Sequence, residues 1–172
     1  FFDVESVWPK LEQALRQAIS NLVAMRETEG SNIYGDFIKR ADLIAEKLAV
    51  IEERSPQVVE EYQTRLSDRI NELLAKHNQV IEPERLLQEV AIFADRTSIT
   101  EEIVRLKSHI KQFRLIIDAD QPVGRKLDFL IQEFNREANT IASKANDYTL
   151  AQVVVEIKAE IEKIREQIQN IE

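Results

Sequence analysis

The sequence contains no cysteine and has only three glycines and four prolines among its 172 residues. The absence of cysteine excludes disulfide bonds, thiolate zinc sites and cysteine nucleophiles. Because glycine and proline form most tight turns, their scarcity favours long helices over many short strands. No apolar run approaches the roughly 18 residues of a membrane-spanning helix, and no signal peptide begins the chain. We therefore expect no membrane partner and a cytoplasmic protein.

Several catalytic motifs are missing as well. The sequence has no glycine-rich phosphate loop, no G-x-S-x-G nucleophile elbow and no H-E-x-x-H zinc motif. These absences argue against a nucleotide-dependent enzyme and against a serine hydrolase. Of the two histidines, His77 lies in a polar segment and is expected at the surface. The second histidine, His109, is the candidate for chemistry.

The net charge of −8 is distributed unevenly along the chain. Residues 83–146 contain ten basic and ten acidic side chains, whereas the rest of the chain contains 13 basic and 21 acidic ones. An acidic protein binds RNA phosphates poorly, since these need lysine and arginine. The balanced centre nevertheless permits a local basic face, so RNA stays possible as a partner.

Apolar residues recur at helical spacing along most of the chain, which predicts an all-α fold of long amphipathic helices. The first helix is expected to stop at Gly30. A break at Ser55–Pro56 is expected to separate two helices that form a helical hairpin arm. Further helices are expected over 83–96, after a capping box at 98–101, and after a loop at 118–122. These last helices would form a C-terminal helical bundle.

The last predicted helix carries a strict heptad pattern. Its apolar residues alternate by three and four positions: Val154, Ile157, Ile161, Ile164, Ile168 and Ile171. Such a seam packs on one neighbouring helix, either of the same domain or of another copy of the chain. Isoleucine at both seam positions favours assemblies larger than a dimer. The pattern leaves both arrangements open.

Residues 122–146 form a helix with two distinct faces. One face is an apolar stripe, and the other carries arginines, amides, hydroxyls and an aromatic ring: Arg125, Phe129, Gln132, Arg136, Asn139, Thr140 and Ser143. Guanidinium groups bind phosphates with two hydrogen bonds, and an exposed ring stacks on an unpaired base. The polar face therefore predicts a recognition surface, although ion pairs and a buried ring at a subunit interface fit the same pattern.

The helix expected after residue 98 carries a carboxylate and an imidazole on one broad face. Glu102, Arg105 and His109 are spaced at i, i+3 and i+7. Glu102 and His109 can share a divalent metal or act in proton transfer. The alternative is an ordinary histidine at a helix interface beside a solvated carboxylate.

A second acidic pair lies on one flank of the helix at 122–146. Glu133 and Glu137 are one turn apart, so their carboxylates repel each other unless a cation lies between them. Such a pair can hold Mg²⁺ or Mn²⁺. The alternative is a solvated flank that Lys126 and Lys144, on the same side, neutralise.

Three stretches of the sequence resemble the C-terminal half of the YicC/YloC family of bacterial stress-associated endoribonucleases. They are ERLLQEVAIFADRTSITEEIVRLKSHIKQF (84–113), PVGRKLDFLIQEFNREANTIASKAND (122–147) and VVVEIKAEIEKIREQIQNIE (153–172). The string GRKLDFLIQEFNREANTIASK is long and irregular, which makes it specific. A further segment, AMRETEG (24–30), resembles the end of the N-terminal region of the family.

The resemblance implies a metal-assisted endonuclease that cuts RNA in the bacterial cytoplasm as a ring-like homo-oligomer, plausibly a hexamer. It also implies that residues 1–30 are the tail of an N-terminal domain and that 83–172 form the C-terminal helical domain. The hairpin arm predicted from the apolar pattern then occupies residues 31–82. Since the chain begins with Phe1 and no methionine, we expect it to be a fragment.

Under this resemblance the candidate residues acquire roles. The catalytic and metal-binding set would be Glu102, His109, Glu133 and Glu137, with Mn²⁺ or Mg²⁺ as the cofactor. The RNA-binding set would be Arg105, Arg125, Lys126, Phe129, Arg136 and Lys144. Either a water molecule or the 2′-hydroxyl of the RNA can attack the phosphate, and in the second case His109 would be the base. The competing hypothesis is a non-catalytic oligomerisation scaffold or RNA-binding adaptor.

Overall fold

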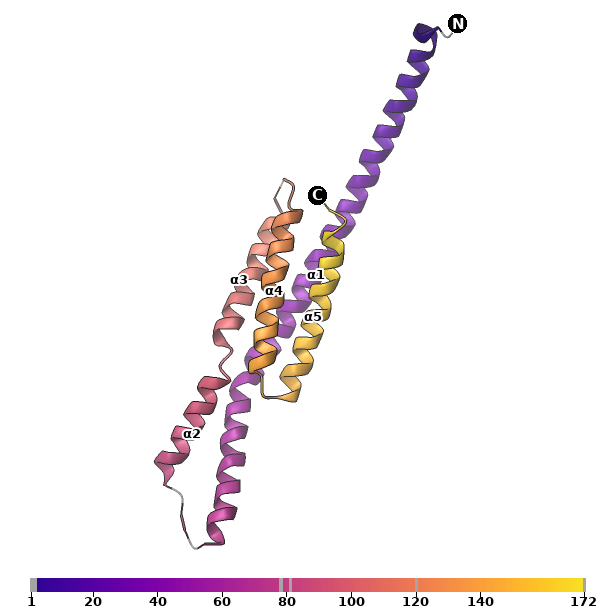
Figure 1. Ribbon diagram of the computed structural model, residues 1–172. Helices are drawn as coiled ribbons and strands as arrows, with labels where there is room; N and C mark the ends of the chain where they lie inside the picture. Colours follow the sequence, from indigo (N-terminus) through magenta and orange to yellow (C-terminus); the bar gives the residue numbers. More distant parts are fainter. Residues whose placement is uncertain (1–2, 78, 81, 120, 172) are drawn as a thin grey trace. The chain divides into compact units, whose positions relative to one another are not determined.

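The computed structural model describes residues 3–77, 79–80, 82–119 and 121–171, and all regular structure within them is α-helical (Figure 1). The described residues form five helices in this order: α1 (Val4–Ala75), α2 (Pro83–Arg96), α3 (Thr100–Ile117), α4 (Gly124–Lys144) and α5 (Tyr148–Ile168). The all-α prediction is confirmed. Asp120 of the predicted loop lies outside the described residues, as do the first two residues and the last. Among the described helices, none has the length and apolar character to cross a bilayer.

Helix α1 corrects two predicted helix ends. Gly30 and Ser55–Pro56 both lie inside it, so the predicted stop and the predicted break are wrong, and with them the hairpin arm bent at that break. An interior glycine costs about 1 kcal/mol and an interior proline about 3 kcal/mol. Ile51 and Val58 are buried on either side of the proline, and burial of each contributes roughly 1.5 to 3 kcal/mol. Burial therefore outweighs the local helix breaker.

The chain reverses direction after α1, about 20 residues beyond the predicted break. Helix α2 then returns beside the end of α1, where the rings of Tyr62 and Phe93 stack with their centroids 3.7 Å apart. The predicted helix at 83–96 is confirmed with the same bounds.

By its contacts the chain divides into two compact units, Phe1–Ile38 and Lys39–Glu172. The first unit holds the beginning of α1. Its apolar stripe faces solvent, with about half of each of these side chains exposed: Leu11, Leu15, Ile19 and Leu22. The second unit holds the candidate functional residues.

The second unit is a helical bundle. Helix α4 packs against both α3 and α5, and short connections make the two pairs antiparallel (Figure 1). The part of α1 from residue 39 onwards runs along both α3 and α5. Four ion pairs join it to these helices: Arg40–Glu160, Lys47–Glu156, Glu52–Lys107 and Asp42–Arg114.

The heptad seam of α5 is buried within the chain. Five of its residues are at most 6% exposed: Val154, Ile157, Ile161, Ile164 and Ile168. Of the two arrangements that the pattern allows, the structure shows packing on helices of the same domain.

Helices α3 and α5 begin differently from one another. At the start of α3 the N-cap residue is Ile99, and no side chain caps the helix. The predicted capping box from Ser98 is therefore wrong, because Ile99 is buried in the core and sets where the helix begins. At the start of α5, Asp147 accepts a hydrogen bond from the backbone N–H of Leu150 and caps the helix.

Asp147 also binds the guanidinium of Arg54 on α1, with 2.8 Å between Nη2 and Oδ1. The hydrogen bond from Arg54 lowers the pKa of Asp147, against the opposing effect of burial, and the bond from Leu150 N–H lowers it further. The same residue therefore caps α5 and ties it to α1.

Candidate functional site

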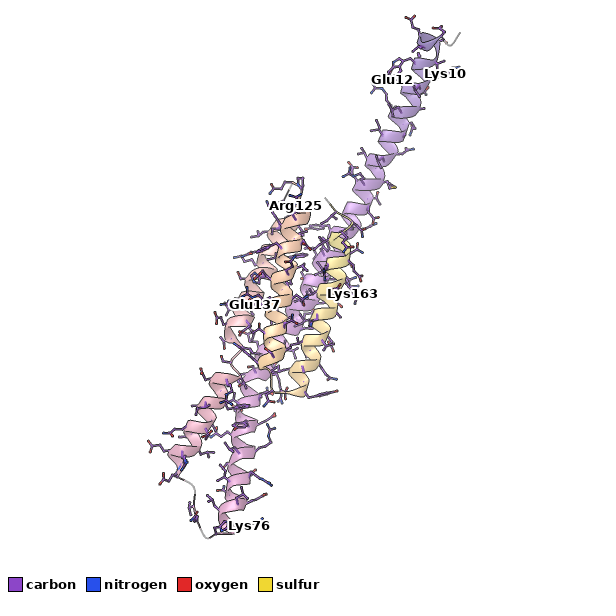
Figure 2. The ribbon with its side chains drawn as sticks, viewed as in Figure 1. Lys10, Glu12, Lys76, Arg125, Glu137 and Lys163 are labelled. Atoms are coloured by element: carbon purple, nitrogen blue, oxygen red, sulfur yellow. The ribbon has the colours of Figure 1, made fainter. Side chains whose placement is uncertain are left out.

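The antiparallel packing of α3 on α4 brings three predicted site residues together. His109 of α3 and Glu133 and Glu137 of α4 each place one potential ligand atom within 4.8 Å of the other two. The two carboxylates come from successive turns of α4, and His109 comes from the facing side of α3. Figure 2 labels Glu137, midway along α4.

The chemistry of these three residues fits a divalent cation. Both ring nitrogens of His109 are buried and have no hydrogen-bond partner among the described residues, whereas buried polar atoms are ordinarily paired. Glu137 is only 3% exposed. At 4.8 Å, two carboxylate charges repel by roughly 3 kcal/mol at an effective dielectric constant of 20. A cation between the three groups would satisfy the imidazole and relieve this repulsion.

One side of the group formed by His109, Glu133 and Glu137 is apolar. The ring of His109 lies against Phe134 with the centroids 6.3 Å apart, and Phe134 packs on Phe113 at 5.9 Å. Both phenylalanines are fully buried. This packing fixes the orientation of the imidazole and keeps water away from one side of the group, which strengthens electrostatic interactions there.

Two arginines lie at the rim of the group. Arg105 Nη1 is 3.8 Å from Glu137 Oε1, and Arg136 Nη1 is 3.7 Å from Glu133 Oε2. These distances are too long for hydrogen bonds. Arg105 also donates a short hydrogen bond to Glu101, four residues earlier on α3. Both arginines are at least half exposed, so their guanidinium groups can reach a ligand in solvent.

Glu102 lies outside this group, in contrast to the prediction that it is a fourth metal ligand. It precedes His109 by seven residues, or roughly 10 Å along the helix axis. Lys144 of α4 instead donates a 2.6 Å hydrogen bond to Glu102 Oε1, while Oε2 is buried without a partner among the described residues. Burial alone would raise the pKa of Glu102, but the hydrogen bond and the charge of Lys144 lower it overall. The pair joins the beginning of α3 to the end of α4.

The remaining predicted RNA-binding residues lie on the first two turns of α4. Arg125, Lys126 and Phe129 are exposed, and the Phe129 side chain is 65% exposed. Arg125 precedes Glu137 by 12 residues, or roughly 18 Å along the axis, and the two are labelled far apart on α4 in Figure 2. A ligand in contact with both must be extended, as a single RNA strand is.

Part of the polar face of α4 is occupied by contacts within the helix. The hydroxyl of Thr140 donates to the backbone carbonyl of Arg136, and that of Ser143 donates to the carbonyl of Thr140. Gln132 donates to Asp128. The exposed charged and aromatic groups at the start of the helix are therefore better candidates for recognition than its hydroxyls.

Sequence reasoning missed the pairing of the site residues with their neighbours. The ion pairs Lys144–Glu102 and Arg105–Glu137 depend on the position of α3 along the axis of α4. The short connection between the two helices predicts that they pack antiparallel, but it does not predict which residues lie opposite one another.

Comparison with known proteins places the chain in a family. Residues 51–172 match the family model described as "Endoribonuclease YicC-like, C-terminal". Over 170 residues the chain is 51% identical to a protein of Clostridioides difficile (strain 630) and 36% identical to one of Haemophilus influenzae (strain ATCC 51907 / DSM 11121 / KW20 / Rd). Both relatives are named "Probable endoribonuclease YicC".

Each alignment covers 99% of this chain and 58% of the relative, so the chain spans less than two thirds of the length of these proteins. The family match includes the whole of α2, α3, α4 and α5, and therefore every candidate site residue. The chain belongs to the YicC-like endoribonuclease family and contains the C-terminal domain of that family.

Proposed function

We propose that the protein is a metal-assisted endoribonuclease whose divalent cation binds between α3 and α4. The observation that carries this proposal is the group of His109, Glu133 and Glu137, in which both imidazole nitrogens are buried without a partner among the described residues. The relatives, which are named as probable endoribonucleases, supply the class of reaction. Mn²⁺ and Mg²⁺ are the cations that suit a site with two carboxylates.

A divalent cation bound there would supply positive charge that stabilises a phosphate in the transition state and acidifies water. Glu133 and Glu137 would hold it through their oxygens, and His109 through one ring nitrogen. Arg105 and Arg136, at the rim, would bind the phosphate that undergoes cleavage. Each of these residues would thus act on the same phosphate from α3 or α4.

The exposed residues at the start of α4 would hold the RNA strand beyond the cleaved bond. Arg125 and Lys126 would contact phosphates, and the exposed ring of Phe129 would stack on an unpaired base. Lys144 was expected to belong to this set. Its hydrogen bond to buried Glu102 supports a structural role for Lys144 instead.

The geometry favours attack by water over attack by the 2′-hydroxyl. When one nitrogen of His109 binds a cation, the imidazole no longer serves as a free base for the 2′-hydroxyl. The two reactions leave different ends on the RNA: a 2′,3′-cyclic phosphate after attack by the hydroxyl, and an ordinary phosphate with a free hydroxyl after attack by water. Analysis of the product ends distinguishes them.

The test uses the whole protein with Mn²⁺ and a single-stranded RNA. Replacing His109 or Glu133 with alanine should lower the cleavage rate more than about 100-fold. Substitution of residues that only support the ligands of a metal already lowers metal affinity or activity about 10- to 100-fold. The matched control is His77→Ala, which removes the other, exposed histidine. If folded His109→Ala and Glu133→Ala variants cleave at the wild-type rate, the site is assigned wrongly.

The competing proposal is an RNA-binding adaptor or scaffold without catalytic activity of its own. It predicts that the pure protein binds RNA and leaves it intact in the presence of Mn²⁺ or Mg²⁺. We also propose that the protein works as a homo-oligomer, plausibly a hexamer, in the bacterial cytoplasm under stress. The exposed apolar stripe of α1 supports association, since such stripes are ordinarily covered in the native assembly.

A further inference from the structure

Each carboxylate of the candidate metal group has one arginine near it, and both ion pairs are loose. Arg105 lies 3.8 Å from Glu137, and Arg136 lies 3.7 Å from Glu133. The Arg136–Glu133 pair lies within α4, whereas Arg105–Glu137 joins α3 to α4 and is longer than the other pair between these two helices, the 2.6 Å contact of Lys144 with Glu102. The two arginines therefore offset the charge of the carboxylates without forming hydrogen bonds to them.

A divalent cation in the group would compete with Arg105 and Arg136 for the carboxylates of Glu137 and Glu133. Two guanidinium groups carry the same total charge as one divalent cation, so either can neutralise Glu133 and Glu137. A divalent cation at a ligand distance of about 2.1 to 2.2 Å interacts with a carboxylate more strongly than a guanidinium at nearly 4 Å. Once the cation is bound, it repels the guanidinium groups, which are exposed enough to move away from it.

Arg105 has an additional anchor that holds it at the rim. Its second amino group donates to Glu101, four residues earlier on α3, whose side chain is exposed. Loss of the contact with Glu137 therefore leaves the guanidinium beside the site, with hydrogen-bond donors free for a phosphate. Arg136 stays on the same helix face as Glu133, one turn away.

We propose that Arg105 and Arg136 exchange partners when the metal binds: they neutralise Glu137 and Glu133 in the metal-free protein and bind an RNA phosphate in the metal-loaded protein. This inference rests on the proposed metal site and adds to it a coupling between metal and RNA. Binding of the metal frees the two arginines, so it raises the affinity for RNA. By linkage, RNA raises the affinity for the metal to the same extent.

The exchange predicts opposite effects of one substitution on two ligands. Arg105→Gln removes a cation that competes for Glu137, so the affinity for Mn²⁺ without RNA should increase about two- to fivefold, the range for a long ion pair whose arginine is half exposed. The affinity for RNA with Mn²⁺ present should decrease about fivefold or more, because a phosphate contact is lost. The affinity for RNA without metal should change by less than about twofold, since Arg105 is then paired with Glu137.

The experiment titrates the chain with Mn²⁺ by calorimetry and with a fluorescent 20-nucleotide single-stranded RNA by anisotropy, with and without Mn²⁺. Because the protein is proposed to cut RNA in the presence of Mn²⁺, gel analysis of the same samples identifies the period in which the RNA is still intact, and the anisotropy is read within that period. The matched control is Arg165→Gln on α5, because Arg165 is as exposed as Arg105 and lies at the same distance, 3.8 Å, from its partner Glu162. This control should leave all three affinities unchanged.

Three outcomes separate the possibilities. Tighter Mn²⁺ binding together with weaker RNA binding only in the presence of metal supports the exchange. If Arg105→Gln leaves the affinity for Mn²⁺ unchanged or weakens it, Arg105 positions Glu137 or is uninvolved, and the exchange is refuted while the metal site stands. If the wild-type chain binds no Mn²⁺, the proposed metal site fails, and the exchange fails with it.

Discussion

Replacing Lys144 with methionine should destabilise the bundle, because it leaves the carboxylate of Glu102 buried without a partner. The side chain of Glu102 is only 5% exposed, and it forms an ion pair with the Lys144 ammonium at 2.6 Å. Removing one member of a buried ion pair costs about 3 to 5 kcal/mol. Lys144 is 37% exposed, so water can partly reach the carboxylate. We therefore expect a loss of about 2 to 3 kcal/mol.

Urea unfolding followed by circular dichroism measures this change. A loss of this size corresponds to a decrease of about 5 to 10 °C in the melting temperature of a chain of this length. The double variant Glu102→Leu with Lys144→Met removes both charges, so its free energy of unfolding should be within about 1 kcal/mol of the wild type. A single variant as stable as the wild type would refute the reasoning, as would a double variant less stable than the single one.

The same pair predicts a dependence on pH. The pKa of Glu102 is lowered in the folded protein, so the pair stabilises the fold above the unfolded pKa of about 4.3. This stabilisation is lost as the pH falls through the lowered pKa. In Lys144→Met the unpaired, buried carboxylate should instead have a raised pKa. The stability difference between wild type and variant should therefore be full at pH 7 and should narrow as acid protonates Glu102.

Three further predictions concern other parts of the chain. Pro56→Ala should raise the free energy of unfolding by about 1 to 2 kcal/mol in urea unfolding, because Pro56 lies inside α1 and leaves a backbone carbonyl without its helical partner; an unchanged or lower stability would contradict a continuous helix. Phe129→Ala should leave stability unchanged, since the ring is 65% exposed, and should weaken RNA binding by about 1 to 3 kcal/mol in anisotropy titrations; unchanged RNA affinity would exclude stacking. Light scattering should give the chain a mass above that of the monomer, and Leu15→Glu should lower it, because Leu15 lies on the exposed stripe of α1; a monomeric wild-type chain would contradict association through this stripe.

The sequence pattern predicts the core of this protein well, because burial follows helical periodicity. The apolar stripe predicted for the helix at 122–146 contains Leu127, Leu130, Ile131 and Phe134, and all four are buried. The prediction is wrong at Pro56, because the energy from burying the neighbouring apolar residues exceeds the cost of proline inside a helix. Ile51 and Val58 are seven residues apart, so the heptad pattern continues across the proline, and this spacing was the signal for one long helix.

The site was predictable in part for the same reason. Residue type and helix face predict His109, Glu133 and Glu137 as site residues, and the structure brings these three together. Glu102 shares the face of His109, but a shared face does not fix the distance along the helix axis. Two helical turns separate the residues, and at that position α4 offers Lys144 in place of a carboxylate.

The central claim is that His109, Glu133 and Glu137 hold one divalent cation, and calorimetric titration of the chain with Mn²⁺ tests it most directly. We expect one Mn²⁺ per chain, an affinity at least about tenfold lower in Glu137→Gln, and an unchanged affinity in Glu102→Gln, which alters a buried carboxylate outside the group. Equal Mn²⁺ affinities of the wild type and Glu137→Gln, or a loss of binding in Glu102→Gln alone, would contradict the account.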